Sequence, residues 1–201
     1  MNLSVEFTNM NIFITNRHPG QAAIDLCDKH VPKMLLESTQ MLSNAYNLYS
    51  SVQGVAPYKP MYLNHPCSKW VLESRGNFDW LFEHALVINS EYTKRFGKTH
   101  KCFHALSTMW MFEKTLTFPM QGMTPHVFVM PMVYRCESVV QSYRSYIKDA
   151  KQFAKWNKGT KKPVWFDPHE IEYNEKNVRK AHKEGIPIPQ KAFTNFFYPV
   201  D

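Results

Sequence analysis

The sequence is poor in glycine, in closely spaced cysteines and in long apolar runs, and each absence excludes a class of protein. Seven glycines in 201 residues argue against an all-β fold, which needs many tight turns. No apolar run approaches the roughly 18 residues of a membrane span, and no signal peptide pattern opens the chain. We therefore expect no membrane contact and a protein that stays in the compartment where it is made.

The four cysteines are far apart and form no C-x-x-C pair: Cys27, Cys67, Cys102 and Cys136. Reduced thiols are favoured over disulfides or a zinc site, and scattered histidines without metal-ligand spacing lead us to expect no metal and no other cofactor.

Apolar residues and positive charge are both plentiful. Apolar residues make up 44% of the chain, which suffices for a core and excludes global disorder. The net charge of +7 favours a polyanionic partner, nucleic acid before an anionic membrane surface. A basic protein without such a partner is the alternative. Oligomeric state stays open.

Hydrophobic periodicity predicts a mainly α fold: a single compact helical domain with a short N-terminal strand and a loop-rich C-terminal tail. We expect residues 1–157 to form the helical core domain and residues 158–201 to extend from it, packed on or near the core. Pro32 is expected to kink the first helix. The expected helices cover residues 21–50, 68–96, 101–116, 137–156 and 174–183, and the expected strand covers residues 11–15.

The first predicted helix carries two ionisable side chains in the middle of its apolar face. On a helical wheel Glu37 lies about 20° from His30, two turns further on, and Lys33 flanks them. Because burying an unpaired carboxylate is costly, Glu37 either has an internal partner that fixes the helix register or faces a cleft. In a cleft, a carboxyl with a raised pKa beside a histidine can move protons. We predict Glu37, His30 and Lys33 as catalytic residues.

The second predicted helix has a polar stripe in addition to its solvent face. Glu73, Asn77, His84, Glu91 and Arg95 fall within about 40° of one another, bordered by tryptophans. The stripe is either a wide solvent face with ion pairs or one wall of a cleft opposite Glu37. For the second case, the predicted substrate-binding residues are Asn64, His65, Trp70, Glu73, Asn77, Trp80, His84 and Arg95.

Residues 143–165 are basic and aromatic. Basic residues at helical spacing predict one cationic ridge, with aromatic residues interleaved. Such a ridge can follow phosphates while aromatic rings stack on unpaired bases, and a solvated helix face is the alternative. The predicted nucleic-acid-binding residues are Arg144, Lys148, Lys151, Lys155, Trp156 and Lys158.

Two resemblances add to these patterns. Over most of its length the chain resembles an uncharacterised family of tailed-phage proteins, which implies a protein acting in the cytoplasm of a bacterial host. The residues that carry this resemblance are Asp28 to His30, Asn64 to Pro66, Trp70, Glu73, Ser74, Asn77, Trp80, Glu91, Tyr92, Arg95, Gly97, Lys98, His100, Ser142 to Arg144, Phe153, Trp156 and Trp165.

The second resemblance rests on Asp28, His30 and Glu37. Their spacing is similar to that in the phage pyrimidine-dimer DNA glycosylase (endonuclease V) family, where an Asp-x-His precedes the catalytic Glu by seven residues. The resemblance implies base-excision chemistry on DNA with Glu37 as the catalytic carboxylate.

The chain departs from this family at several positions. Family members attack the sugar with the amine of their N-terminal residue and form an imine, whereas here nine residues precede Met10. Leu36 and Gln40 replace arginines that accompany the family's Glu. Imine chemistry, with or without strand cleavage at the abasic site, would need Lys33 or Lys29. Otherwise Glu37 would activate water.

Two functions compete on this basis. The first is an N-glycosylase or related base-processing enzyme acting on DNA. The second is a non-catalytic nucleic-acid-binding or host-takeover protein, in which Glu37 is dispensable. A nucleotide-processing enzyme is a third option, without support from any phosphate-binding loop.

Overall fold

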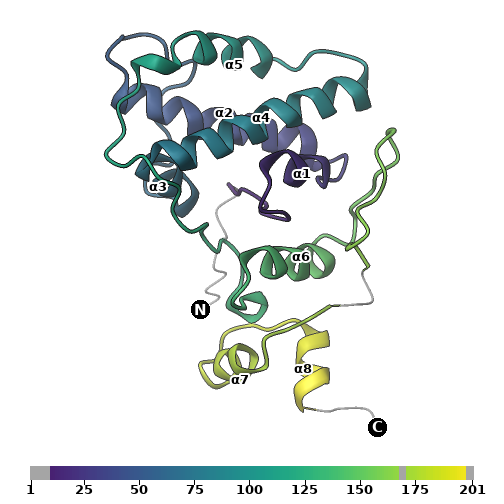
Figure 1. The fold of residues 1–201 in the computed structure, drawn as a ribbon. Helices are drawn as coiled ribbons and strands as arrows, with labels where there is room; N and C mark the ends of the chain where they lie inside the picture. Colours follow the sequence, from purple (N-terminus) through teal and green to yellow (C-terminus); the bar gives the residue numbers. More distant parts are fainter. Residues whose placement is uncertain (1–9, 168–170, 198–201) are drawn as a thin grey trace. The chain divides into compact units, whose positions relative to one another are not determined.

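The computed structural model describes residues 10–167 and 171–197 of the chain. The predicted mainly α fold is confirmed (Figure 1). The predicted N-terminal strand is wrong: residues 11–15 form no strand, because no other described segment pairs with them and most of their side chains enter the core instead. The helices are α1 (Pro19–Ile24), α2 (His30–Tyr49), α3 (Pro66–Glu73), α4 (Arg75–Phe96), α5 (Cys102–Met111), α6 (Val139–Ala150), α7 (Glu175–Lys183) and α8 (Gln190–Phe197), with 3-10 turns η1 (Glu113–Thr115) and η2 (Met132–Tyr134).

The chain divides into two compact units. Unit 1 comprises Met1–Val129 and Ala154–Lys162, and unit 2 comprises Met130–Phe153 and Pro163–Asp201. These units do not coincide with the predicted domains, whose boundary at 157/158 stays a prediction.

Helix α4 is the centre of unit 1, where it packs against α1, α2 and α3, while α2 also packs against α5 (Figure 1). Its apolar face supplies Phe78, Leu81 and Ile88, and α2 supplies Met34 and Met41, all at most 1% exposed. This packing fixes the face of α2 that carries Glu37.

Both predicted long helices are interrupted. Residues 25–29 separate α1 from α2, so Pro32 lies in the first turn of α2, where a proline removes no helical hydrogen bond. The expected kink within a continuous helix is therefore wrong. The second interruption is Ser74, whose backbone is extended and whose hydroxyl accepts a hydrogen bond from Asn77 N at 3.1 Å, capping α4.

The segment after α5 is attached to the start of α4. Arg75 N and Gly76 N donate to the carbonyls of Met120 and Gln121 at 2.8 and 3.0 Å, so donors that a helix leaves free in its first turn are satisfied. Gly76 permits this approach, because a Cβ there would lie 2.7 Å from Met123 N.

Unit 2 contains α6, α7 and α8. Helix α6 is shorter than the predicted 137–156 helix, α7 matches the predicted 174–183 helix closely, and α8 was not predicted. Helix α7 packs against η2 and α8. Asn177 Nδ2 fixes it to the η2 turn by donating to the carbonyls of Met132 and Arg135 at 3.0 and 2.9 Å.

All four cysteines are free thiols, as predicted, and Cys27, Cys67 and Cys102 are buried. In the parts of the chain that the structure describes, no helix combines the length and hydropathy of a membrane span.

Candidate active site

Glu37 lies on the buried face of α2 and also faces a cavity of about 290 Å³. Its Oε2 accepts a hydrogen bond from Asn11 N at 3.0 Å, and its Oε1 lies 3.4 Å from Lys33 Nζ. The carboxylate therefore has internal partners and an opening at the same time. The residues that line the cavity are Met10, Lys33, Leu36, Glu37, Gln40, Met61 and Tyr62.

The surroundings of Glu37 favour its protonated form. Burial raises the pKa of this carboxyl, and the Asn11 amide and the Lys33 ammonium oppose the shift without cancelling it. A carboxyl with a raised pKa beside a cavity is suited to exchange protons with a bound molecule. Glu37 is one of the predicted catalytic residues, and its catalytic role stays a prediction.

Helix α2 also positions the loop on the other side of the cavity. Asn44 Nδ2 donates to Met61 O at 2.9 Å, and Asn44 Oδ1 accepts from Met61 N at 3.1 Å. The fully buried Asn44 thus fixes the loop that carries Met61 and Tyr62 against the helix that carries Glu37. Neither Met61 nor Tyr62 is predicted from the sequence as a site residue, because a loop has no periodicity to mark them.

His30 and Lys33 differ in their position relative to the Glu37 cavity. His30 is buried in the first turn of α2, stacks on Phe13 with 4.8 Å between ring centroids, and does not line the Glu37 cavity. Lys33, half-exposed and one turn before Glu37, does line it. The structure thus brings Lys33 to Glu37 and leaves His30 among core side chains.

The polar stripe of the second predicted helix makes internal contacts and does not face Glu37. Asn77 Nδ2 donates to Trp70 O and to Thr124 Oγ1, both at 2.7 Å. Thr124 Oγ1 also donates to Glu73 Oε2 at 2.9 Å. Glu73 and Asn77 therefore hold the segment around Thr124 against α3 and α4, and the expected cleft between the two stripes is wrong.

Trp70, Trp80 and His84 form a ring cluster with His126. The ring centroids of His126 lie 4.7 Å from Trp70 and 4.8 Å from Trp80, and those of Trp80 and His84 are 5.1 Å apart. His84 Nδ1 lies 2.9 Å from Pro19 O. Burial lowers the pKa of both histidines to about 4, so both rings are neutral at neutral pH.

Asn64 and His65 lie in the turn before α3. Asn64 is exposed, whereas His65 is buried as the N-cap residue, with Nδ1 accepting a hydrogen bond from Cys67 N at 3.1 Å. The backbone N of His65 donates to Tyr62 O at 2.9 Å, so this turn adjoins the rim of the Glu37 cavity.

Arg95 is a structural residue. Its side chain is fully buried and donates to the carbonyls of Leu26 and Ile24 at 2.6 and 2.9 Å. Its guanidinium lies 2.7 Å from Glu91 Oε2 and 3.3 Å from Asp28 Oδ1. Burial raises the pKa of Glu91, but Thr160, Arg95 and Lys94 together lower it below its ordinary value. The network joins α4 to the turn between α1 and α2.

The predicted cationic ridge is not a helical ridge. Helix α6 ends at Ala150, Lys148 is buried, and Arg144 lies over the Trp165 ring at 5.4 Å. Arg144, Lys148 and Lys151 belong to unit 2, whereas Lys155, Trp156 and Lys158 belong to unit 1.

The unit 1 part of the basic stretch is bound to the turn between α1 and α2. Asp28 N donates to Lys155 O at 2.9 Å, Asn157 N donates to Asp28 Oδ2 at 2.7 Å, and Trp156 Nε1 donates to Asp25 O at 3.1 Å. Asp28 therefore positions a basic segment and lies outside the Glu37 cavity.

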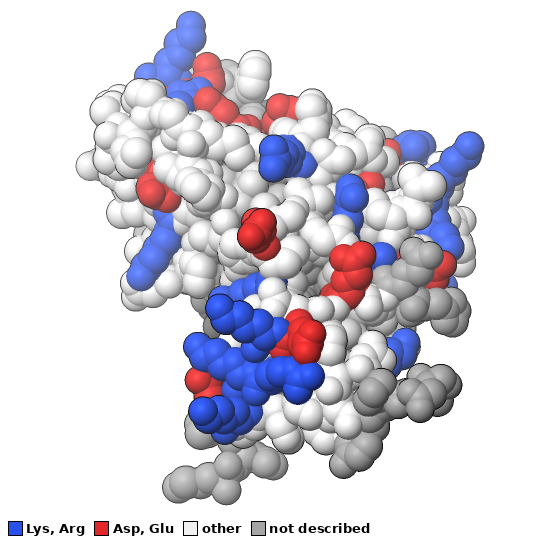
Figure 2. All heavy atoms as spheres, turned by 60° about the horizontal axis from the view of Figure 1, so that its bottom comes forward, with Lys and Arg blue, Asp and Glu red and all other residues white. Residues whose placement is uncertain are grey.

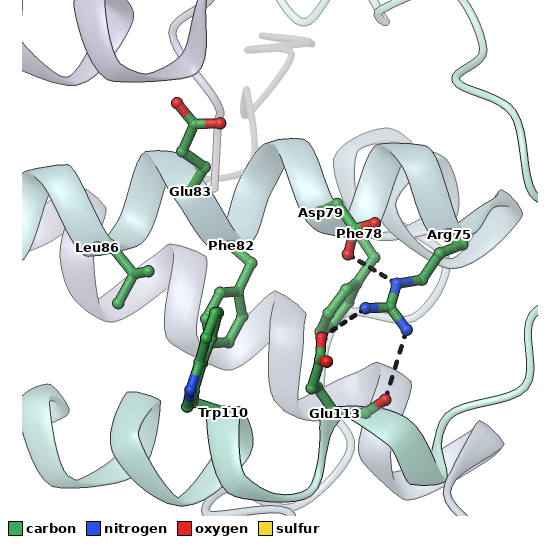
Figure 3. Close-up of a pocket in the computed structure, with 8 residues that line it drawn as sticks. All are labelled: Arg75, Phe78, Asp79, Phe82, Glu83, Leu86, Trp110 and Glu113. Atoms are coloured by element: carbon green, nitrogen blue, oxygen red, sulfur yellow. Dashed lines mark hydrogen bonds and ion pairs between the residues drawn. The ribbon is translucent and has the colours of Figure 1, made fainter.

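A larger groove of about 430 Å³ runs between α4 and α5 (Figure 3). Arg75 bridges Asp79 and Glu113 at one end, and Trp110 packs beside Phe82 further along (Figure 3). Glu83 also lines the groove, so its lining contains more acidic side chains than basic ones, of which Arg75 is the single example. An acidic lining disfavours DNA.

A third cavity, of about 500 Å³, lies in unit 2 near Tyr134, Cys136 and Tyr173. It contains none of the predicted site residues. Among the described residues, no group of three or more His, Cys, Asp and Glu side chains is placed to hold a metal ion.

Unit 1 thus combines a small helical fold with a buried carboxylate that faces a cavity. Residues 10–104 match the sequence model of a family described as pyrimidine dimer DNA glycosylase, which is just under half of the chain. The chain thus resembles this family over α1 to α4 and the start of α5, a stretch that contains every residue lining the Glu37 cavity. The match indicates a DNA glycosylase-type function with DNA as substrate. No curated protein and no solved structure matches the chain.

Proposed function

We propose that the protein is a DNA N-glycosylase that removes a base from a nucleotide held at the Glu37 cavity. The observation that carries the proposal is Glu37 itself, a largely buried carboxylate that faces a cavity within the glycosylase-like segment. A base must leave the double helix before such a site can reach its glycosidic bond. A cavity of about 290 Å³ suits one extruded base.

In the proposed reaction the Glu37 carboxylate accepts a proton from water. The water oxygen forms a bond to C1′ of the sugar, the bond from C1′ to the base nitrogen breaks, and the base leaves with the electron pair. Asn11 N orients Glu37 and is no nucleophile, because the lone pair of a peptide nitrogen is delocalised into the carbonyl. Lys33 holds the other carboxylate oxygen and attracts phosphate.

An imine mechanism with abasic-site lyase activity is the second candidate, supported by the position of Lys33 at the same cavity. Neutral Lys33 Nζ would form a bond to C1′ as the base leaves and lose a proton to Glu37. The C1′–O4′ bond would then break as O4′ takes up a proton, which opens the sugar ring and leaves an imine at C1′. This imine would permit elimination of the 3′ phosphate. Lys29 does not line the cavity and is not supported as the amine.

Duplexes carrying a pyrimidine dimer, a uracil or an abasic site test the proposal. Water activation is expected to produce alkali-labile sites without a borohydride-trapped adduct, and Glu37→Gln is expected to abolish them. A trapped adduct that disappears in Lys33→Met would instead establish the imine mechanism. Glu175→Gln, which removes an exposed carboxylate on α7, is the matched control and should keep full activity.

The competing function is non-catalytic nucleic-acid binding. Salt-dependent DNA binding, no base release from any duplex and no effect of Glu37→Gln on binding would together favour it. For either function we place the protein in the cytoplasm of a bacterial host, following the phage resemblance.

A further inference from the structure

We propose that Tyr62 is a base-stacking residue whose ring contacts the base that enters the Glu37 cavity. Tyr62 lines this cavity together with Lys33 and Glu37, and 60% of the residue is exposed. The inference rests on the proposed function, which supplies a DNA base as the occupant.

The backbone of Tyr62 is strained. Its φ is +50°, a left-handed conformation that no other non-glycine residue of the described chain adopts. A side chain with a Cβ rarely adopts this region, and such strain persists only where surrounding contacts enforce it. Strained residues of this kind concentrate at functional sites.

Hydrogen bonds hold the chain on both sides of the strained residue. Before it, the Asn44 amide bonds both the N–H and the carbonyl of Met61. After it, the carbonyl of Tyr62 accepts from His65 N at 2.9 Å. The backbone is therefore fixed while the ring extends into solvent at the cavity rim.

Packing does not account for this arrangement. An exposed ring adds little buried apolar surface, so the core gains little from a tyrosine in a conformation that glycine adopts freely. A flat ring next to the apolar side chains of Met10 and Met61 provides a stacking surface for a base, and Lys33 beside it is placed for the adjoining phosphate.

The test uses a duplex in which 2-aminopurine lies opposite a tetrahydrofuran abasic analogue, because an unpaired base is the least costly to extrude. Fluorescence titration gives the Kd of the full-length protein for this probe. Tyr62→Phe is expected to bind like the wild type, since it keeps the ring. Tyr62→Ala and Tyr62→Gly are expected to bind about 5- to 150-fold more weakly, the loss of one base stack.

Two further measurements separate stacking from a structural role. Tyr62→Gly relieves the left-handed strain, so its Tm should equal or exceed that of the wild type while its affinity falls. Trp110→Ala is the matched control: Trp110 is 59% exposed but lies at the acidic groove between α4 and α5, and its removal should leave the Kd unchanged. Unchanged binding in Tyr62→Gly, weaker binding in Tyr62→Phe or Trp110→Ala, or no binding of the probe by the wild type would each overturn the inference.

The chemistry is tested separately on the same samples. Tyr62-dependent binding without base release from any duplex would support the stacking role and contradict the glycosylase proposal. Glu37-dependent base release that is the same in Tyr62→Gly as in the wild type would support the glycosylase proposal and contradict the stacking role of Tyr62.

Discussion

Glu37 has opposite effects on the stability of the fold and on its proposed chemistry. Its pKa in the folded protein is raised above the ordinary 4.5, so folding favours the protonated carboxyl. The contribution of the Glu37 carboxyl to the free energy of unfolding is therefore fully present below pH 4.5. It is lost as the pH rises through the pKa that Glu37 has in the folded protein. A carboxylate retained at a cost to stability is typical of a functional position.

Replacing Glu37 should show this trade-off directly. In Glu37→Gln the buried charge disappears, and at neutral pH we expect a Tm equal to or above that of the wild type. The rate of base release should fall about 10²- to 10⁴-fold, the usual effect of losing a general base. Thermal melts at neutral pH and at pH 4.5 check the stability effect, which should shrink at the lower pH. A lower Tm at neutral pH would show that Glu37 serves the fold.

Lys33 should set the acidic limb of the pH–rate profile. Because its ammonium lowers the pKa of Glu37, Lys33→Met should raise that pKa further. If Glu37 activates water, base release persists in this variant and its acidic limb moves to higher pH. Complete loss of base release at every pH would instead identify Lys33 as the nucleophile.

At the scale of elements, Arg95 joins three parts of unit 1. It contacts Glu91 within α4, the carbonyl of Ile24 at the end of α1, and Asp28 and the carbonyl of Leu26 in the turn before α2. Removing a fully buried cation leaves its acidic partners uncompensated, which is far more costly than losing an exposed pair.

Arg95→Met should therefore lower the free energy of unfolding by about 3–5 kcal/mol, measured by urea denaturation. Lys94→Met is the control, because Lys94 pairs with the same Glu91 but is 54% exposed. Its loss should cost about 1 kcal/mol or less. Equal losses in the two variants would contradict the structural role assigned to Arg95.

The helices could be predicted from the sequence, but their interruptions could not be predicted from periodicity alone. The helical spacing of apolar residues continues across residues 25–29 and across Ser74. A single helical wheel therefore fits the residues on both sides of each break. Local signals were present: Pro32 suits a first helical turn, and Ser74 followed by Asn77 suits an N-cap. These signals fix where a helix begins more directly than the apolar stripe does.

The same distinction applies to the candidate site. Glu37 and Lys33 could be predicted because a carboxylate on an apolar helix face needs a reason to be there. Tyr62 could not, since its position depends on a hydrogen-bonded amide 18 residues earlier, at Asn44. His84 and Arg95 were predicted for binding, yet their partners are backbone carbonyls and acids of other segments that no helical wheel contains.

At the scale of the whole molecule, the positive charge belongs mainly to unit 1. Unit 1 contains 15 Lys and Arg against nine Asp and Glu, whereas unit 2 contains nine against eight. Residues 154–162 supply four of the cations and no acid. They belong to the same unit as the Glu37 cavity and are fixed to it through Asp25 and Asp28.

Unit 2 nevertheless has its own cationic surface. Figure 2 shows Lys and Arg side chains gathered in the lower part of its view. Helix α7 contributes exposed cations at Lys176, Arg179, Lys180 and Lys183. Two of these lie near acids on or next to the same helix, Arg179 at 2.8 Å from Glu175 and Lys180 at 3.9 Å from Glu184. Cations paired in this way release fewer counterions from DNA than unpaired ones.

Salt dependence of DNA binding distinguishes the two surfaces. The slope of log Kobs against log salt changes by about 0.9 for each phosphate of duplex DNA that the protein no longer neutralises. We therefore consider a variant in which Lys155, Lys158, Lys161 and Lys162 are all changed to Gln. The magnitude of its slope should fall by up to about 3.6, and it should bind every duplex more weakly, whatever the lesion. The matched variant, with Lys176, Arg179, Lys180 and Lys183 changed to Gln, should change the slope less. A larger change in the α7 variant would place the DNA on unit 2 and contradict the assignment of the DNA surface to the unit that holds Glu37.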